Sequence, residues 1–93
     1  MREEVKAFVS LGPLPDACAD VETIRLFEQS LARIKSPVSA EEAAALVGSF
    51  GVDDCFGLAW SLLHLVESAP TLVGPEAATS ENEWIRLLWE RSQ

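Results

Sequence analysis

The sequence contains no tyrosine, a single histidine and only two cysteines among its 93 residues. Any metal centre or catalytic pair built on an imidazole would have to use His64, and neither Cys18 nor Cys55 belongs to a CxxC motif or another metal-ligand spacing. The sequence therefore predicts no metal and no cofactor. We interpret the cysteines as two small buried hydrophobic side chains, with a disulfide between them as the alternative.

Lysine and arginine are absent from residues 36–85, a range that holds eight acidic residues and so accounts for the whole net charge of −8. Outside this range, seven acids balance seven bases. Binding to nucleic acid or anionic lipid requires cations that neutralise phosphates, so this stretch argues against both kinds of partner. The same acidity suits a basic protein partner, with solubility alone as the alternative explanation.

Long apolar runs and strand-like alternation are also missing. The longest uncharged apolar run, residues 55–63, is far shorter than the ~20 residues that span a bilayer. The N-terminus, MREEVKAFVS, includes two acids and no apolar segment typical of a signal peptide, so we expect a cytoplasmic protein. Without alternating segments, the sequence predicts an all-α fold.

Residues 53–68 form the segment around which we expect the chain to fold. On a helix at 100° per residue, its apolar side chains cover an arc of roughly 200°, about twice the stripe of an ordinary surface helix. Such a helix has to be central. Asp53 is its predicted N-cap, and Asp54 adds favourable negative charge to the first turn.

Two amphipathic segments precede this central helix near the N-terminus. The first covers residues 2–10 and leads into an extended connection with two prolines. The second repeats apolar residues from Val21 to Ile34 and is capped by either Asp16 or Asp20.

Two further segments begin with the capping-box pattern, in which a serine is followed three residues later by a glutamate. Ser39 and Glu42 predict a helix that ends near Gly48, whereas Ser80 and Glu83 predict the last helix of the chain. We therefore predict one domain over residues 1–93, a bundle of four to five short helices, with a mobile loop across residues 69–79.

The polar residues of the central segment fall on one lengthwise strip, which is the candidate site: Gly57, Trp60, Ser61, His64 and Glu67. Trp60 lies one turn from Gly57, where the missing side chain leaves room for a neighbouring helix. That helix would be the chain's own first or last helix, or else it would belong to a partner. Tryptophan among small and polar residues has the composition of a binding hot spot.

A catalytic reading of this strip would pair Ser61 as nucleophile with His64 as base. Ser61 lies in the interior of a predicted helix, without the strained turn and oxyanion donors that acyl transfer needs. The sequence therefore predicts no catalytic residue and a protein that is not an enzyme.

In size, acidity and helical content the chain is similar to small bacterial immunity and antitoxin-type inhibitors, although no motif carries this likeness. The leading hypothesis is a non-enzymatic inhibitor that covers the basic surface of a toxin or nuclease. A helical adaptor or homodimer that uses the Trp60 face is the alternative. The candidate partner-binding residues are the strip residues together with four acids, Asp53, Asp54, Glu41 and Glu42.

Overall fold

The computed structural model describes residues 1–16, 18–51, 55, 57–70 and 78–91. These ranges contain helices and no strand, so the all-α prediction is confirmed. The helices are α1 (Glu3–Ser10), α2 (Val21–Ala32), α3 (Ala40–Val47), α4 (Leu58–Glu67) and α5 (Glu83–Arg91). Within the same ranges, no helix combines the length and the hydrophobicity that crossing a membrane requires.

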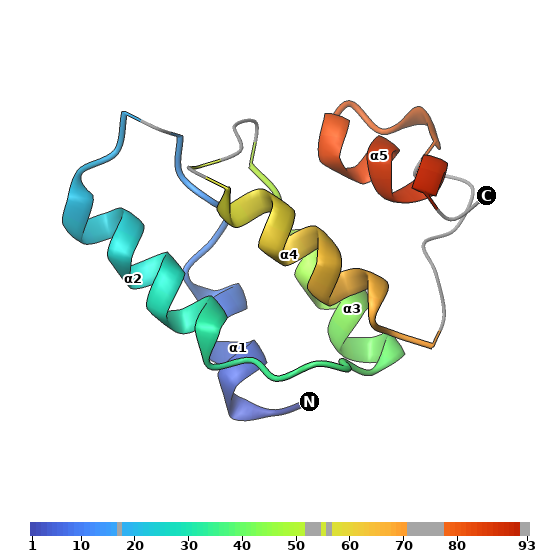
Figure 1. Ribbon diagram of the computed structural model, residues 1–93, viewed down its shortest axis with the longest axis horizontal. Helices are drawn as coiled ribbons and strands as arrows, with labels where there is room; N and C mark the ends of the chain where they lie inside the picture. The colour runs from blue at the N-terminus through green and yellow to red at the C-terminus, as the bar shows by residue number, and fades with distance from the viewer. Residues whose placement is uncertain (17, 52–54, 56, 71–77, 92–93) are drawn as a thin grey trace.

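Figure 1 shows α2, α4 and α5 in one layer, with α4 between the other two. α3 packs behind α4, and α1 packs against both α2 and α3. α1 and α3 therefore form a second layer. All five helices contribute side chains to one cluster of buried apolar residues. Within it, Phe8 of α1 and Phe27 of α2 meet edge to face with their ring centroids 6.1 Å apart.

The start of α2 settles which of the two predicted caps is used. The Asp20 carboxylate accepts a hydrogen bond of 2.7 Å from the backbone N–H of Thr23, whereas Asp16 accepts one of 2.9 Å from Cys18. Asp20 is therefore the N-cap of α2. Val21 was predicted to lie on the buried side but is 63% exposed, because the buried side of α2 begins one turn later.

The predicted capping box at the start of α3 is confirmed. Ser39 Oγ accepts from the Glu42 N–H at 3.1 Å, and a Glu42 carboxylate oxygen accepts from the Ser39 N–H at 2.9 Å. The helix ends at Gly48, also as predicted. The connection between α1 and α2 is attached to the segment just after α3, because the buried Leu14 donates its N–H to the carbonyl of Ser49 at 2.9 Å.

α4 begins at Leu58, four residues later than a helix capped by Asp53 would begin. Gly57 precedes it with φ of 91°, and Cys55 has φ of 50°, so the backbone at these two positions is left-handed and cannot continue a right-handed helix. Gly57 is thus the N-cap position of α4, and the prediction of Asp53 as its cap is wrong. Asp53 and Asp54 themselves lie outside the described residues.

α5 begins with a different cap from the predicted Ser80 and Glu83 box. Asn82 Oδ1 accepts from the backbone N–H of Trp84 at 2.8 Å, and Ser80 Oγ accepts from the N–H of Asn82 at 3.1 Å. The Asn82 amide also donates to the carbonyl oxygens of residues 50–51 at 3.2 and 3.0 Å. Asn82 therefore caps α5 and also attaches its start to the segment that follows α3.

The predicted mobile loop at residues 69–79 falls largely outside the described residues, since the structure leaves out 71–77. At its start, Ala69 is buried in the apolar cluster and donates its N–H to the carbonyl of Val66 at 3.1 Å. The described beginning of this loop therefore packs as a continuation of α4.

Candidate functional site

One side of α4 faces outward. Six of its ten residues are buried, and the three exposed ones are Trp60, Ser61 and His64. Glu67 follows on the same side at helical spacing, while Gly57 stands at the start of the helix. The structure therefore aligns the predicted strip along the outward side of α4.

Trp60 contacts α5 but is not covered by it. Its ring meets that of Trp84 edge to face, with the centroids 5.1 Å apart, and the residue remains 42% exposed. Trp84 is itself stacked on Phe50, with ring centroids 6.4 Å apart and the planes 7° from parallel. The chain's own last helix thus holds one part of the indole, and the rest is open to solvent.

The carboxylate of Glu67 is bound by α5. Arg91 of α5 donates two hydrogen bonds to the Glu67 carboxylate, at 2.7 and 3.1 Å. This forked ion pair raises the pKa of Arg91, through hydrogen bonding first and charge attraction second. His64 is exposed and lies beside Trp60, with the ring centroids 6.4 Å apart. Glu67 therefore joins α5 to α4, with its carboxylate engaged by Arg91 rather than by His64.

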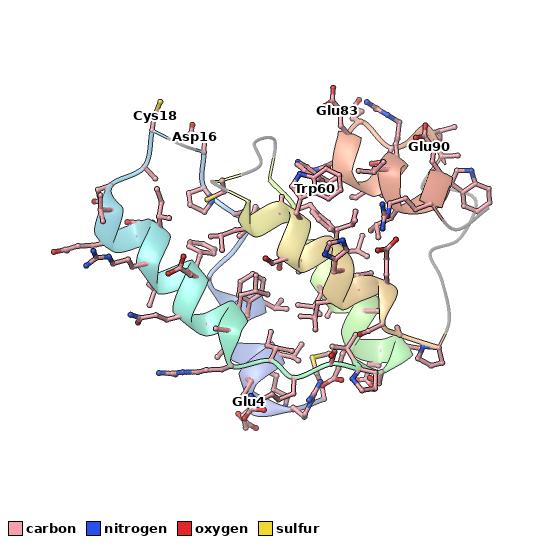
Figure 2. All side chains as sticks on the ribbon, viewed as in Figure 1. Glu4, Asp16, Cys18, Trp60, Glu83 and Glu90 are labelled. Carbon is pink, nitrogen blue, oxygen red and sulfur yellow. The ribbon has the colours of Figure 1, made fainter. Side chains whose placement is uncertain are left out.

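A groove of about 310 Å³ runs between Trp60 and the outward side of α5, and we call it the Trp60 groove. Its lining residues are Trp60, Glu83, Trp84, Arg86, Leu87 and Glu90. Figure 2 shows Trp60 extending toward α5, with Glu83 and Glu90 near the two ends of that helix. The groove thus combines an exposed indole with two exposed carboxylates.

Among the described residues that line the Trp60 groove, Arg86 is the one cation. Its guanidinium donates to the carbonyl of Ser80 at 2.6 Å and lies 4.0 Å from the Glu83 carboxylate. Arg86 is thus directed toward the start of α5. Across the described residues no ion pair within 4.0 Å involves Glu90, so the charge at that end of the groove is uncompensated.

A second groove of about 380 Å³ lies between α2 and α4, and we call it the α2–α4 groove. Four apolar side chains line it together with two small strip residues, a further alanine and one acid: Leu31, Ile34, Leu58, Leu65, Gly57, Ser61, Ala32 and Glu28. The strip residues therefore divide between two grooves, with Trp60 on one side of α4 and Gly57 and Ser61 on the other.

The four acids predicted to bind a partner differ in where the structure places them. Asp53 and Asp54 are outside the described residues, and Glu41 is exposed. Glu42 is only 4% exposed, and its carboxylate accepts hydrogen bonds from the Arg2 backbone and guanidinium at 3.0 Å each. Assigning Glu42 to a partner surface was therefore wrong, because its carboxylate is buried and occupied.

The contacts of Glu42 also determine how it titrates. The Arg2 guanidinium, followed by the Ser39 and Arg2 backbone N–H groups, stabilises the charged carboxylate and lowers the pKa of Glu42 to about 2. The same pair raises the pKa of Arg2. Glu42 therefore joins the N-terminus to α3 as a charged residue at any physiological pH.

The cysteines do not pair with each other. Cys18 is exposed, whereas Cys55 is completely buried in the apolar cluster, and no disulfide joins the two. The interpretation of two buried hydrophobic side chains holds for Cys55 and is wrong for Cys18. The described residues include no group of three or more histidine, cysteine, aspartate or glutamate side chains placed to hold a metal ion.

Sequence reasoning missed three acids beside the outward side of α4: Glu28, Glu83 and Glu90. Glu83 and Glu90 are seven residues apart, so helical periodicity places them on one side of α5, but only the docking of α5 brings them to Trp60. No protein-family model, curated protein or solved structure matches the chain.

Proposed function

We propose that the chain is a non-enzymatic binding module for a basic protein, which docks on the outward side of α4 with Trp60 as its anchor. The observation that carries this proposal is the 42% exposed Trp60 beside a groove bordered by Glu83 and Glu90. Large aromatic side chains dominate the energy of many interfaces, and acidic rims steer basic partners into contact. A toxin or nuclease is the proposed target class, with inhibition in the cytoplasm as the role.

The electrostatics support a partner surface at this location. Glu42 and Glu67, the two acids in forked contacts with arginine, hold the fold together. By contrast, Glu28, Glu83 and Glu90 are exposed on either side of α4. These three acids add negative charge around Trp60 and Ser61, where it would raise the association rate of a cationic protein.

The contacts of Glu67 also favour binding over catalysis. A triad-like use of Ser61 and His64 requires a third group that orients the imidazole. Glu67 is the acid at the right helical spacing, and Arg91 engages both of its oxygens. Ser61 lies within α4 and not on a strained turn.

The test is affinity capture of the tagged protein's partner from an extract of its own source, followed by binding measurements with the purified partner. The double variant Glu83→Gln/Glu90→Gln should weaken binding and flatten its dependence on salt between about 50 mM and 1 M, where screening becomes severe. Glu4→Gln/Glu22→Gln removes the same charge from exposed sites outside both grooves and should change affinity little. Equal effects of both double variants would overturn the proposed location.

Trp60→Ala tests the anchor separately from the charges. If Trp60 is the hot spot of the interface, its truncation should cost about 2 kcal/mol or more of binding free energy, roughly a thirtyfold loss of affinity. Trp84 remains stacked on Phe50, so the variant should keep its fold. A binding loss below about threefold would show that the partner docks elsewhere.

A helical adaptor or homodimer is the second candidate, and the α2–α4 groove favours it. Its apolar floor and the small residues Gly57, Ala32 and Ser61 suit close approach of another helix. Association through this groove should respond weakly to salt and strongly to Ser61→Trp, which would fill it. Light scattering over a range of protein concentrations distinguishes the two candidates, because a concentration-independent monomer contradicts the homodimer.

A further inference from the structure

We propose that the Trp60 groove holds a single arginine side chain of the protein partner, with its guanidinium against the Trp60 indole and in contact with the Glu90 carboxylate. This inference rests on the proposed function and names the chemistry that the groove recognises. It requires an exposed aromatic surface, an uncompensated carboxylate and a space of suitable size, and the groove supplies all three.

The aromatic surface is supplied by Trp60. Its edge-to-face contact with Trp84 fixes the position of the indole while leaving the residue 42% exposed at the groove. Tryptophan has the strongest quadrupole of the aromatic side chains, so its face attracts cations, and arginine is found there more often than lysine. Because neighbouring rings already hold Trp60, little of its mobility would be lost on binding.

The uncompensated charge is that of Glu90. Arg86 is bonded to the Ser80 carbonyl and lies nearest to Glu83, at the start of α5. Glu83, Arg86 and Glu90 together leave the groove with one negative charge in excess. His64 lies beside Trp60 and is a further group that can carry positive charge. The groove is therefore complementary to one added cation when His64 is neutral.

The groove has room for an extended side chain. It measures about 310 Å³ and is open to solvent. A planar guanidinium can lie against the indole and still present two N–H groups to a carboxylate, which an ammonium cannot do.

The experiment is a titration of the full chain with L-argininamide at pH 8 and low salt, followed by the indole N–H signals of Trp60, Trp84 and Trp89 in two-dimensional NMR. Trp60→Phe identifies the Trp60 signal. L-citrullinamide, a neutral analogue of almost the same shape, and L-lysinamide are titrated in parallel. Argininamide should shift the Trp60 and Trp84 signals along saturable curves, with a smaller shift for Trp89, which is not part of the groove lining.

Two variants locate the binding. Glu90→Gln should weaken argininamide binding by about threefold, the effect expected from losing one exposed ion pair, whereas Glu4→Gln on α1 should leave it unchanged. Equal shifts with citrullinamide, equal binding of lysinamide, or insensitivity to Glu90→Gln would each overturn the arginine assignment.

The outcome is distinguishable from failure of the proposed function. If the groove ignores argininamide but Glu83→Gln/Glu90→Gln still weakens binding of a captured protein, the arginine assignment fails and the binding function stands. If argininamide binds as expected but no protein partner depends on Trp60, the groove recognises guanidinium groups and the proposed function fails.

Discussion

Asn82 provides the most informative single test of how the site is built. Its side-chain oxygen accepts from the backbone N–H groups of Trp84 and Ile85 at 2.8 and 3.4 Å. Its side-chain nitrogen donates to the carbonyls of Phe50 and Gly51 at 3.2 and 3.0 Å. Asn82→Ala removes all of these contacts, while Asn82→Ser retains an N-cap oxygen but loses both donors.

The expected loss follows from these contacts. Losing an N-cap costs about 1 kcal/mol, and each lost hydrogen bond to a partly buried carbonyl costs about another 1 kcal/mol. Asn82→Ala should therefore lower the free energy of unfolding by about 3 kcal/mol and Asn82→Ser by about 2 kcal/mol. For a domain of this size the larger loss is a substantial share of a total of roughly 5–15 kcal/mol.

Urea denaturation followed by circular dichroism measures the global effect, and hydrogen exchange of the α5 amides measures the local one. Because Leu88 is the one fully buried side chain of α5, release of this helix should occur at lower cost than global unfolding. Both variants should therefore raise exchange in α5 more than in α4. Gln29→Ala, an exposed amide on α2, is the control and should stay within about 0.5 kcal/mol of the wild type.

Two results would refute this reasoning. If Asn82→Ala, like the Gln29→Ala control, changes the free energy of unfolding by less than about 0.5 kcal/mol, the Asn82 side chain does not hold α5 in place. If Asn82→Ser is as damaging as Asn82→Ala, the cap contributes nothing beyond the two donated bonds.

Three further predictions concern the rest of the fold. A Cβ at Gly51 would overlap the Leu14 carbonyl, so Gly51→Ala should lower the thermal midpoint strongly, whereas Gly48→Ala, with ordinary spacing, should not. Leu63→Ala should cost about 2–5 kcal/mol in urea denaturation, because Leu63 is completely buried. Since the pKa of Glu42 is lowered from 4.5 to about 2, its stabilising effect is complete above pH 4.5 and is lost as the pH falls toward 2; the stability gap between wild type and Glu42→Gln should close across that range.

Helical periodicity predicted much of this fold because burial on one side of a helix leaves a direct imprint on the sequence. The cap at the start of α3 was equally predictable, since a capping box involves residues only three apart. The start of α4 could not be predicted from the sequence, because aspartates favour helix caps and turns alike. Gly57 was interpreted as a small residue within the helix, whereas its left-handed backbone marks the position where the helix begins.

The candidate site was predictable only in part. Spacing alone placed Trp60 and His64 on the polar side of α4, and both are exposed in the structure. The start of α5 is attached through Asn82, whose amide reaches carbonyl groups 31 and 32 residues earlier in the chain. No local pattern records such a contact, so the acids that α5 brings beside Trp60 were missed.

The distribution of cations explains why an acidic chain can fold around an acidic surface. Residues 36–85 hold no lysine or arginine, yet Arg2 and Arg91, from opposite ends of the chain, pair with Glu42 and Glu67 inside that range. These pairs join the N-terminus to α3 and α5 to α4, so cations are used where carboxylates lie within the packed structure. Glu90 has no such ion pair among the described residues, so it leaves one unmatched negative charge beside the exposed Trp60. An unmatched carboxylate next to an exposed indole is the arrangement that we propose to contact a cation of another protein.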